Sequence, residues 1–253
     1  MKYRIFTDSE GPLYSLEKDR IIRIVYQNGR VETYESNLKN PEYYIGQPTT
    51  AIKVNFLSPL LGYTQLNYEK NLRPGRSYEL SLGIIGLGKN QEMSTIYFSG
   101  SNSYESLKRG ARGVFSGAGY KFTRIPDFIN KGTRYSHLFQ GSYVKPELIL
   151  GLYGQNFYRN NPNGNPIQER ESIFFTGLLI NVGKQWVLGD AFLIDIYGGL
   201  GYALDTLNRK YDNSSEYTYN DLVGNHFAMI SGVDSAFGIT GGFKIGLLLN
   251  QKK

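Results

Sequence analysis

Residues 235–249 read Ser-Ala-Phe-Gly-Ile-Thr-Gly-Gly-Phe-Lys-Ile-Gly-Leu-Leu-Leu, and this stretch decides the fold. In steps of two, one face carries Phe237, Ile239, Gly241, Phe243, Ile245 and Leu247. The other face carries Gly238, Thr240, Gly242, Lys244, Gly246 and Leu248. Such alternation is typical of a β-strand with one apolar face. That face would contact a second sheet in a soluble sandwich, or lipid on the outside of a membrane barrel.

The composition favours strands and turns over helices. The 253 residues include 30 glycines, 21 tyrosines and 14 phenylalanines, against one tryptophan and three methionines. Tyr and Phe favour pleated surfaces, and Gly favours tight turns and crowded interiors. A mean hydropathy of −0.36 is compatible with a membrane barrel, whose strands alternate apolar and polar residues. No run approaches the roughly 20 apolar residues of a transmembrane helix, which argues against a helical membrane protein.

Several kinds of site are disfavoured by residue counts. The chain has no cysteine, which excludes disulfides, thiolate metal sites and a lipoprotein anchor. Two histidines, His137 and His226, are too few for a His-rich metal centre. The net charge of +6 is mild, and no basic run alternates with aromatic residues as in single-strand binders. We therefore expect no cofactor, no metal and no nucleic-acid partner.

Residues 1–40 predict a small periplasmic β module. Asn28-Gly29, between two apolar runs, is a strong hairpin signal. Three or four short strands are too few for a stable core, and the start lacks the apolar segment of a signal peptide. We therefore expect this module to be truncated, with further strands upstream. Residues 41–49, which contain Gln47-Pro48, predict a linker.

Longer alternating segments begin at Thr50 and predict a closed antiparallel transmembrane β-barrel of about eight strands over residues 50–253. Before the final strand at 235–249, the expected strands cover residues 51–58, 63–72, 78–86, 113–122, 142–158, 173–182 and 191–204. An even number of strands suits a closed bacterial barrel, and short connections alternate with long polar ones, as periplasmic turns do with external loops. The connection over 123–141 is longer than this pattern predicts. We expect a polar loop over 89–109, a turn over 186–190, and a bulge or strand end at Pro146.

The face with small residues also carries charges. They are Lys53, Lys121, Lys145 and Lys244 against Glu69, Glu79, Glu147 and Asp195. A soluble sandwich could bury eight charges only at severe desolvation cost, whereas side chains can fill the interior of a barrel of about eight strands. Because the positive and negative charges balance, we predict an ion-pair network with trapped water that plugs the barrel.

Aromatic residues lie mostly near the ends of the segments. They are Tyr63, Tyr68, Tyr78, Tyr120, Tyr153, Tyr158, Trp186, Tyr197 and Tyr202. Those on the outward face are candidates for the aromatic belts found at membrane interfaces, and ordinary strand aromatics are the alternative.

Several short motifs carry a family resemblance. They are Ala-Ile-Lys-Val-Asn-Phe-Leu-Ser-Pro-Leu at 51–60, Leu-Asn-Tyr-Glu-Lys at 66–70, Arg-Tyr-Ser-His at 134–137, Tyr-Val-Lys-Pro-Glu-Leu at 143–148 and Ile-Thr-Gly-Gly-Phe-Lys-Ile-Gly at 239–246. With them the chain resembles the small outer-membrane β-barrel proteins of Bacteroidota, within the wider group of OmpA- and OmpX-like barrels. Residues 11–16 and 23–29 look like the periplasmic β module that often precedes such barrels.

The resemblance implies a fold and a bacterial outer-membrane location, and no activity. It also implies a signal peptide and further strands before Tyr3, and a C-terminal aromatic residue. In this chain the nearest aromatic to the C-terminus is Phe243.

Enzymatic chemistry is the weakest of the alternatives. A lipid-modifying barrel needs a serine within reach of an oriented histidine, and the candidates are His137 beside Ser136, and His226 near Ser231. Adjacent residues of an extended chain point to opposite faces, which argues against the first pair. The glycine clusters at 83–88 and 198–201 are not followed by a helix, so they predict no phosphate site.

The leading prediction is a non-enzymatic outer-membrane barrel with a plugged interior, in a structural or docking role. Its expected partners are outer-membrane lipid or lipopolysaccharide and an envelope protein. The alternatives are a narrow channel or small-solute transporter and a lipid-modifying enzyme, with a soluble sandwich as the alternative fold.

Overall fold

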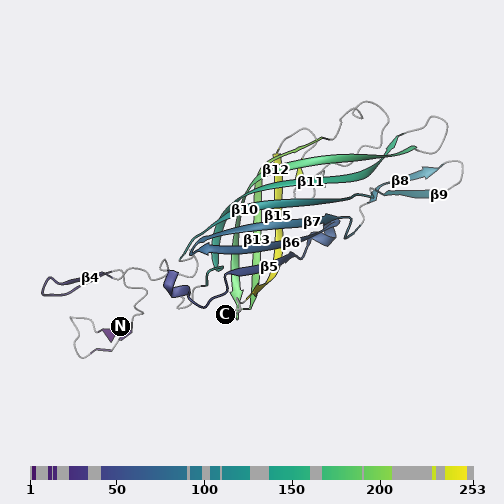
Figure 1. Cartoon of the computed structure of the whole chain (residues 1–253). Helices are drawn as coiled ribbons and strands as arrows, with labels where there is room; N and C mark the ends of the chain where they lie inside the picture. The colour runs from purple at the N-terminus through teal and green to yellow at the C-terminus, as the bar shows by residue number, and fades with distance from the viewer. Residues whose placement is uncertain are drawn as a thin grey trace.

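The strand pairings close a β-barrel, which confirms the predicted fold class. The computed structural model describes residues 2–3, 11–12, 14–15, 23–33, 41–89, 92–98, 103–108, 110–125, 137–159, 167–189, 191–206, 230–231 and 237–249. Eight strands form the wall: β5 (Thr50–Asn55), β6 (Tyr63–Arg73), β7 (Arg76–Ile85), β10 (Arg112–Thr123), β11 (Gly141–Arg159), β12 (Ile167–Leu188), β13 (Phe192–Asp205) and β15 (Phe237–Leu249). Each pairs antiparallel with the next wall strand along the chain, and β15 also pairs with β5, which closes the ring (Figure 1). The short strand β14 (Ile230–Ser231) pairs with β15 beside it.

The strands are staggered around the barrel. One row of paired residues runs through Leu247, Ile52, Tyr68, Leu80, Ala118, Leu148, Leu178, Tyr202 and Phe237. The row begins and ends on β15, at Leu247 and Phe237, so one circuit shifts the register by ten residues. Strand number, tilt and stagger are linked in a closed barrel, and eight strands leave an interior that side chains can fill.

The two ends of the barrel differ. We call one end the base: there Thr50 of β5 pairs with Leu249 of β15. The base carries the turn at 73–76 and the short connection from β12 to β13. The opposite loop end carries the connections after β5, β7, β11 and β13. Gly75 forms the β6–β7 turn with a φ of 77°, and a Cβ there would lie 2.8 Å from the Thr123 carbonyl oxygen. Tight turns alternate with longer connections, as the sequence predicts.

Along the wall strands, alternate residues point inward and outward. In β5, Ala51, Lys53 and Asn55 are buried while Ile52 and Val54 are exposed. The same alternation continues in β15, where the glycine-and-lysine face is the inner one. Both faces of the 235–249 stretch therefore lie as predicted over residues 237–249.

Three local predictions were wrong. Residues 89–109, predicted as a loop, contain the hairpin of β8 (Glu92–Phe98) and β9 (Ser103–Lys108). Trp186, predicted in a turn, lies within β12. Pro146 neither ends β11 nor shifts its register, although the ladder with β10 lacks the pairs between Gly119/Glu147 and Phe122/Val144. Proline has no backbone N–H to donate, which accounts for that gap in the ladder.

The N-terminal part contains short hairpins. β1 (Lys2–Tyr3) pairs with β2 (Tyr14–Ser15), and β3 (Arg23–Val25) pairs with β4 (Val31–Thr33) around the predicted turn at Asn28-Gly29. Gly29 has a φ of 80°, as such a turn requires. Two short 3-10 turns, η3 (Pro41–Tyr44) and η4 (Ser58–Leu61), flank β5. Among the described residues, no helix has the length and apolarity to cross a membrane.

Candidate functional site: a buried charge network

The eight charged residues predicted on the inner face lie inside the barrel. Seven of the eight wall strands contribute them: Lys53 (β5), Glu69 (β6), Glu79 (β7), Lys121 (β10), Lys145 and Glu147 (β11), Asp195 (β13) and Lys244 (β15). None of them is more than 4% exposed. Residues two apart on a strand point to the same face. Each charged residue lies an even number of positions from other buried residues of its strand, so its side chain points into the lumen. Apart from His137, they are the buried ionisable Lys, Arg, His, Asp and Glu residues of the described part of the chain.

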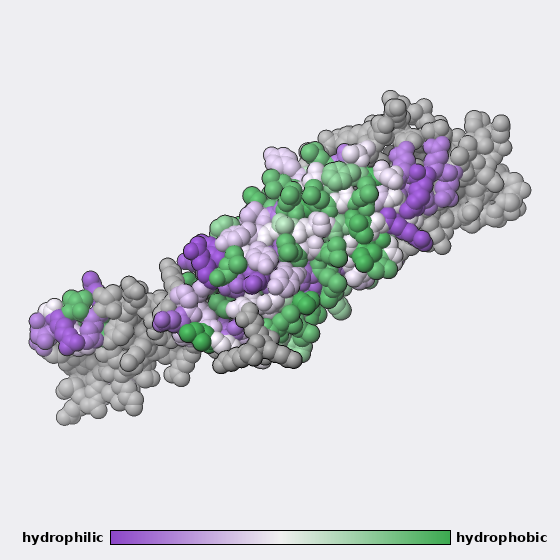
Figure 2. Space-filling view, in the orientation of Figure 1, coloured by the Kyte–Doolittle hydropathy of each residue, from purple (hydrophilic) through white to green (hydrophobic). Residues whose placement is uncertain are grey.

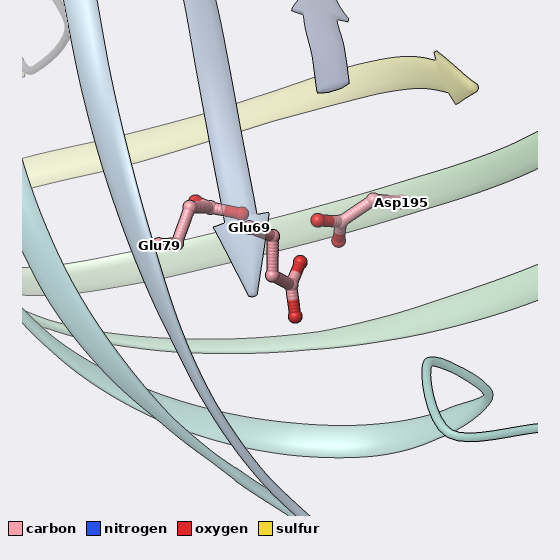
Figure 3. A group of neighbouring side chains, drawn as sticks. All are labelled: Glu69, Glu79 and Asp195. Atoms are coloured by element: carbon pink, nitrogen blue, oxygen red, sulfur yellow. The ribbon is translucent and has the colours of Figure 1, made fainter. Parts of the chain in front are cut away.

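Two ammonium groups bind the same three carboxylates. Lys53 Nζ lies 2.6 Å from Glu69 and 2.9 Å from Asp195, and it also contacts Glu79. Lys121 Nζ lies 2.9 Å from Glu69, 3.0 Å from Glu79 and 3.1 Å from Asp195. Figure 3 shows these three carboxylates converging from different strands. The ion pairs therefore join strands that are not neighbours in the wall.

Glu79 extends the network to the other lysines. It lies 2.7 Å from Lys145 Nζ and 2.8 Å from Lys244 Nζ, so all four lysines contact this one carboxylate. Lys145 also lies 2.9 Å from Glu147, which accepts a hydrogen bond of 2.5 Å from Asn181 Nδ2. The eight charges form one connected cluster with no net charge.

Neutral side chains complete the carboxylate contacts. The Tyr143 hydroxyl donates to Asp195 at 2.7 Å, and Gln185 Nε2 donates to Glu69 at 2.8 Å. Ser77 Oγ donates to Glu69 at 2.6 Å. None of these three neutral residues is among the predicted inner-face residues. Ser77 and Tyr143 lie two residues from Glu79 and Lys145 on the same strands, and Gln185 pairs with Asp195 across β12 and β13. A buried carboxylate is stabilised when its remaining lone pairs accept hydrogen bonds.

Two tyrosine rings face the ammonium groups. Lys121 Nζ lies 4.2 Å from the centre of the Tyr143 ring, and Lys244 Nζ lies 4.4 Å from that of Tyr197. These distances are within the range of cation–π attraction, which strengthens away from water.

Glu69, Glu79 and Asp195 also have the donor geometry of a hard-cation site. One oxygen from each lies within 4.8 Å of the others. Carboxylate oxygens suit Mg²⁺ and Ca²⁺. Lys53 and Lys121 each already contact all three carboxylates, so a divalent ion would have to displace two ammonium groups. The arrangement fits a structural ion-pair cluster better than a metal site.

Apolar layers lie on both sides of the charges. Toward the loop end, the interior is filled by a buried cluster of Tyr63, Ile85, Phe115, Ile149, Tyr153, Ile173, Phe175, Leu179 and Ala203. At the base, Phe139 packs with Ala51, Leu193 and Leu248. The charge network therefore lies between two hydrophobic layers.

Residues 137–140 form a turn that lies against the base. The Leu138 N–H donates to Gln47 Oε1 at 3.1 Å, and the Leu138 carbonyl accepts from Asn71 Nδ2 at 3.2 Å. Phe139 is 1% exposed, and its ring stacks on His137. These contacts give the long 123–141 connection a physical role, because its end covers the base of the barrel.

His137, a catalytic candidate in the sequence, is a buried residue of this turn. Its Nδ1 accepts a hydrogen bond of 3.1 Å from the Phe139 N–H, which requires that nitrogen to be unprotonated. Burial lowers the pKa of His137 to about 4. Ser136 and His226 lie outside the described residues, so the structure gives no distance for either serine–histidine pair.

The aromatic residues divide between the two faces. Tyr63, Tyr153 and Tyr197 are buried in the interior, whereas Tyr68 and Tyr202 face outward. Among the outward ones, Tyr78, Tyr120 and Trp186 lie near the base.

Comparison with known proteins adds one solved structure. No family model and no curated protein matches the chain. The crystal structure of the N-terminal β-barrel domain of Pseudomonas aeruginosa OprF is similar at 13% identity, with a TM-score of 0.33 over 80% of this chain and 98% of that chain. The description of this chain as an eight-stranded barrel of the outer-membrane type follows from its own pairing, stagger and alternation.

Proposed function

We propose that this chain is a non-enzymatic outer-membrane β-barrel with a plugged interior, which acts structurally or as a docking partner in an envelope assembly. The observation that carries the proposal is the single neutral cluster that joins seven wall strands through the lumen. On the motifs quoted above, we further propose that it belongs with the OmpA- and OmpX-like barrels of Bacteroidota.

The outer wall supports a location in lipid. The nine-residue row from Leu247 to Phe237 circles the barrel, and all its members are apolar or aromatic. Leu178 and Leu200 are more than half exposed, and a hydrophobic band crosses the visible wall in Figure 2. Soluble monomers rarely expose apolar surface on this scale. Lipid, with lipopolysaccharide in the outer leaflet, would cover it.

The three interior layers support a plugged barrel. A solute crossing the barrel would have to pass the Phe139 layer, the charge network and the aromatic layer around Phe115 and Phe175. The inward-facing glycines leave no open passage, because aromatic rings fill the space beside them. A Cβ on Gly83 would lie 2.0 Å from the Phe115 ring, and one on Gly151 would lie 2.3 Å from the Phe175 ring.

The non-enzymatic role rests on the position of His137. A lipid-modifying site needs a base that faces the bilayer or a substrate cleft. The His137 ring instead stacks against Phe139 at the base, and its Nδ1 is already occupied by a backbone N–H.

A docking role is supported by the N-terminal hairpins. Isolated two-stranded hairpins are marginal in water, because they have too little apolar surface to bury. Val25 and Val31 pair across β3 and β4 and are both more than half exposed. An envelope partner that covers these residues would stabilise the module.

Co-purification tests the docking role. The tagged chain would be extracted from outer membranes in mild detergent, and its companions identified. We expect a stoichiometric envelope protein that is lost when residues 1–40 are deleted, while the barrel itself still shows a heat-dependent gel shift. Recovery of the intact chain without a stoichiometric companion would contradict the docking role.

A further inference from the structure

The outer wall at the base carries a patch of cations and aromatic rings, which we call the basic–aromatic rim. It consists of Tyr68 and Lys70 of β6, Arg73 at the end of β6, Arg76 and Tyr78 of β7, and Tyr120 and Phe122 of β10. The neighbours Glu69, Ser77 and Lys121 point inward, so strand alternation turns the residues of the rim other than Arg73 outward. Arg73 is exposed because the register shifts between Asn71 and Arg73 at the end of β6.

The strand register brings the members of the rim together. Lys70 pairs with Tyr78, which pairs with Tyr120 on the next strand. One step nearer the base, Arg73 pairs with Arg76, which pairs with Phe122. The rows therefore place cations beside aromatic rings on three adjacent strands.

The rings and cations of the rim are in direct contact. The Arg76 guanidinium lies 4.8 Å from the centre of the Phe122 ring, and the Tyr120 and Phe122 rings lie 5.0 Å apart. The Tyr68 and Tyr78 rings are 6.3 Å apart. Stacking of this kind holds a guanidinium against the wall. Arg76 Nη1 also donates a hydrogen bond of 2.7 Å to the Gly75 carbonyl, and the remaining N–H groups of the guanidinium are left for a ligand.

The rim has no matching negative charge on its own strands. The acidic residues of β6, β7 and β10 are Glu69 and Glu79, and both point into the lumen. Within the described part of the chain, Lys70 and Arg73 have no ion-pair partner. Arg73 lies opposite Arg76, and like charges in a cross-strand pair repel. A bound anion would relieve that repulsion.

The cations are concentrated on one side of the barrel. Elsewhere around the base, β12 carries one outward cation, Lys184, whose ammonium lies 5.4 Å from the centre of the Trp186 ring. The outward residues of β13 and β15 there are apolar, and Phe192, Leu247 and Leu249 are all substantially exposed. On the rim strands, the wall beyond the cations is also apolar, with Leu66, Leu80 and Leu82 about half exposed. The patch thus combines a cationic edge with an adjoining apolar surface.

We propose that the basic–aromatic rim binds the headgroup phosphate of an anionic phospholipid in the leaflet that surrounds the base. The Arg73 and Arg76 guanidiniums and the Lys70 ammonium bind the phosphate oxygens, and the acyl chains lie along the apolar wall of β6 and β7. A soluble anion would use the cations but not this wall. The proposal rests on the proposed membrane location, with the base on the periplasmic side.

Lipid binding to the refolded full-length chain tests this proposal. Insertion is checked first by flotation with vesicles, because a chain that does not insert contradicts the membrane location itself. The protein in maltoside detergent is then titrated with dioleoyl phosphatidylglycerol or dioleoyl phosphatidylcholine, and retained lipid is measured by native mass spectrometry. The rim variant is Lys70→Gln with Arg73→Gln and Arg76→Gln. The control, Lys89→Gln with Arg112→Gln and Arg170→Gln, removes the same charge at the loop end.

We expect the wild-type chain and the control to retain phosphatidylglycerol at on the order of a hundredfold lower concentration than phosphatidylcholine, since each of the three cations near an anionic headgroup contributes on the order of a fivefold preference. The rim variant should insert normally and lose this preference. Equal retention of the two lipids by the inserted wild-type chain, or an unchanged preference in the rim variant, would overturn the proposal. Displacement of the lipid by glycerol 3-phosphate at equal concentration would also overturn it, in favour of a soluble anion.

Discussion

Glu79 on β7 and Lys244 on β15 form an ion pair of 2.8 Å through the lumen, although β5 and β6 separate their strands in the wall. The contact connects residues 165 positions apart in the chain. Because Glu79 also contacts Lys53, Lys121 and Lys145, one carboxylate links four other strands to its own. Removal of this one carboxylate would leave buried ammonium groups on four strands without one of their partners.

Glu79→Gln should therefore destabilise the barrel strongly. The change leaves four buried lysines with three carboxylates, and an uncompensated buried charge costs about 3–5 kcal/mol. Urea unfolding in lipid vesicles measures the loss. Glu42→Gln removes an exposed carboxylate on η3 and should change stability by less than about 0.5 kcal/mol. Equal stabilities for the two variants would show that the buried cluster contributes little.

Lys145 and Glu147 should be energetically coupled. Lys145→Met and Glu147→Gln each leave an unbalanced charge, whereas the double variant restores neutrality. We expect the double variant to be less destabilised than the sum of the two single variants by about 1–3 kcal/mol. The measurement is a double-mutant cycle of unfolding free energies. Additive effects would contradict a shared network.

Two glycines should respond oppositely to alanine. A Cβ on Gly83 would lie 2.0 Å from the Phe115 ring, whereas one on Gly198 would have nothing within 4 Å. Gly83→Ala should destabilise by about 1–3 kcal/mol through overpacking. Gly198→Ala should be neutral or stabilise by up to about 1 kcal/mol, because alanine restricts the unfolded chain. Denaturant unfolding of both variants tests whether the lumen is packed at Gly83.

His137 should make the barrel less stable in mild acid. Its folded pKa of about 4 is below the ordinary value of about 6.5, so the unfolded chain binds the proton first as the pH falls. The contribution of the neutral His137 to the stability of the folded barrel is complete above pH 6.5 and is lost toward pH 4. The loss in unfolding free energy is about 2 kcal/mol at pH 4.5. His137→Asn keeps an acceptor for the Phe139 N–H and should lack this component. Unfolding curves from pH 7.5 to 4.5 that match for wild type and variant would contradict a buried neutral histidine.

Period-two alternation predicted most of the fold. In β5 and β15, small or polar residues alternate with large apolar ones, and the sequence correctly predicts which face of each strand is buried. The register gave the eight charges a common inner face, and the barrel brings them together. Tyr143 shares the register of Lys145, so the same pattern could have included it. Gln185 lies beyond the strand predicted at 173–182, because β12 continues to Leu188.

Other features had no periodic signal. The position of Phe139 depends on tertiary contacts with Ala51, Leu193 and Leu248, and a turn residue carries no alternation that points to them. The β8–β9 hairpin was predicted as a loop because its polar residues suggested solvent, although the β-branched and aromatic residues at 95–98 favour a strand. The interior aromatic layer was missed because tyrosines near strand ends were read together as belt candidates.

Single-channel recording in a planar bilayer tests the central claim most directly. The refolded chain would be inserted at low density after a heat-dependent gel shift confirms the folded barrel. Because three packed layers fill the lumen, we predict no discrete conductance steps. Reproducible, stepwise conductance from the folded wild-type chain would contradict a plugged barrel and favour a narrow channel.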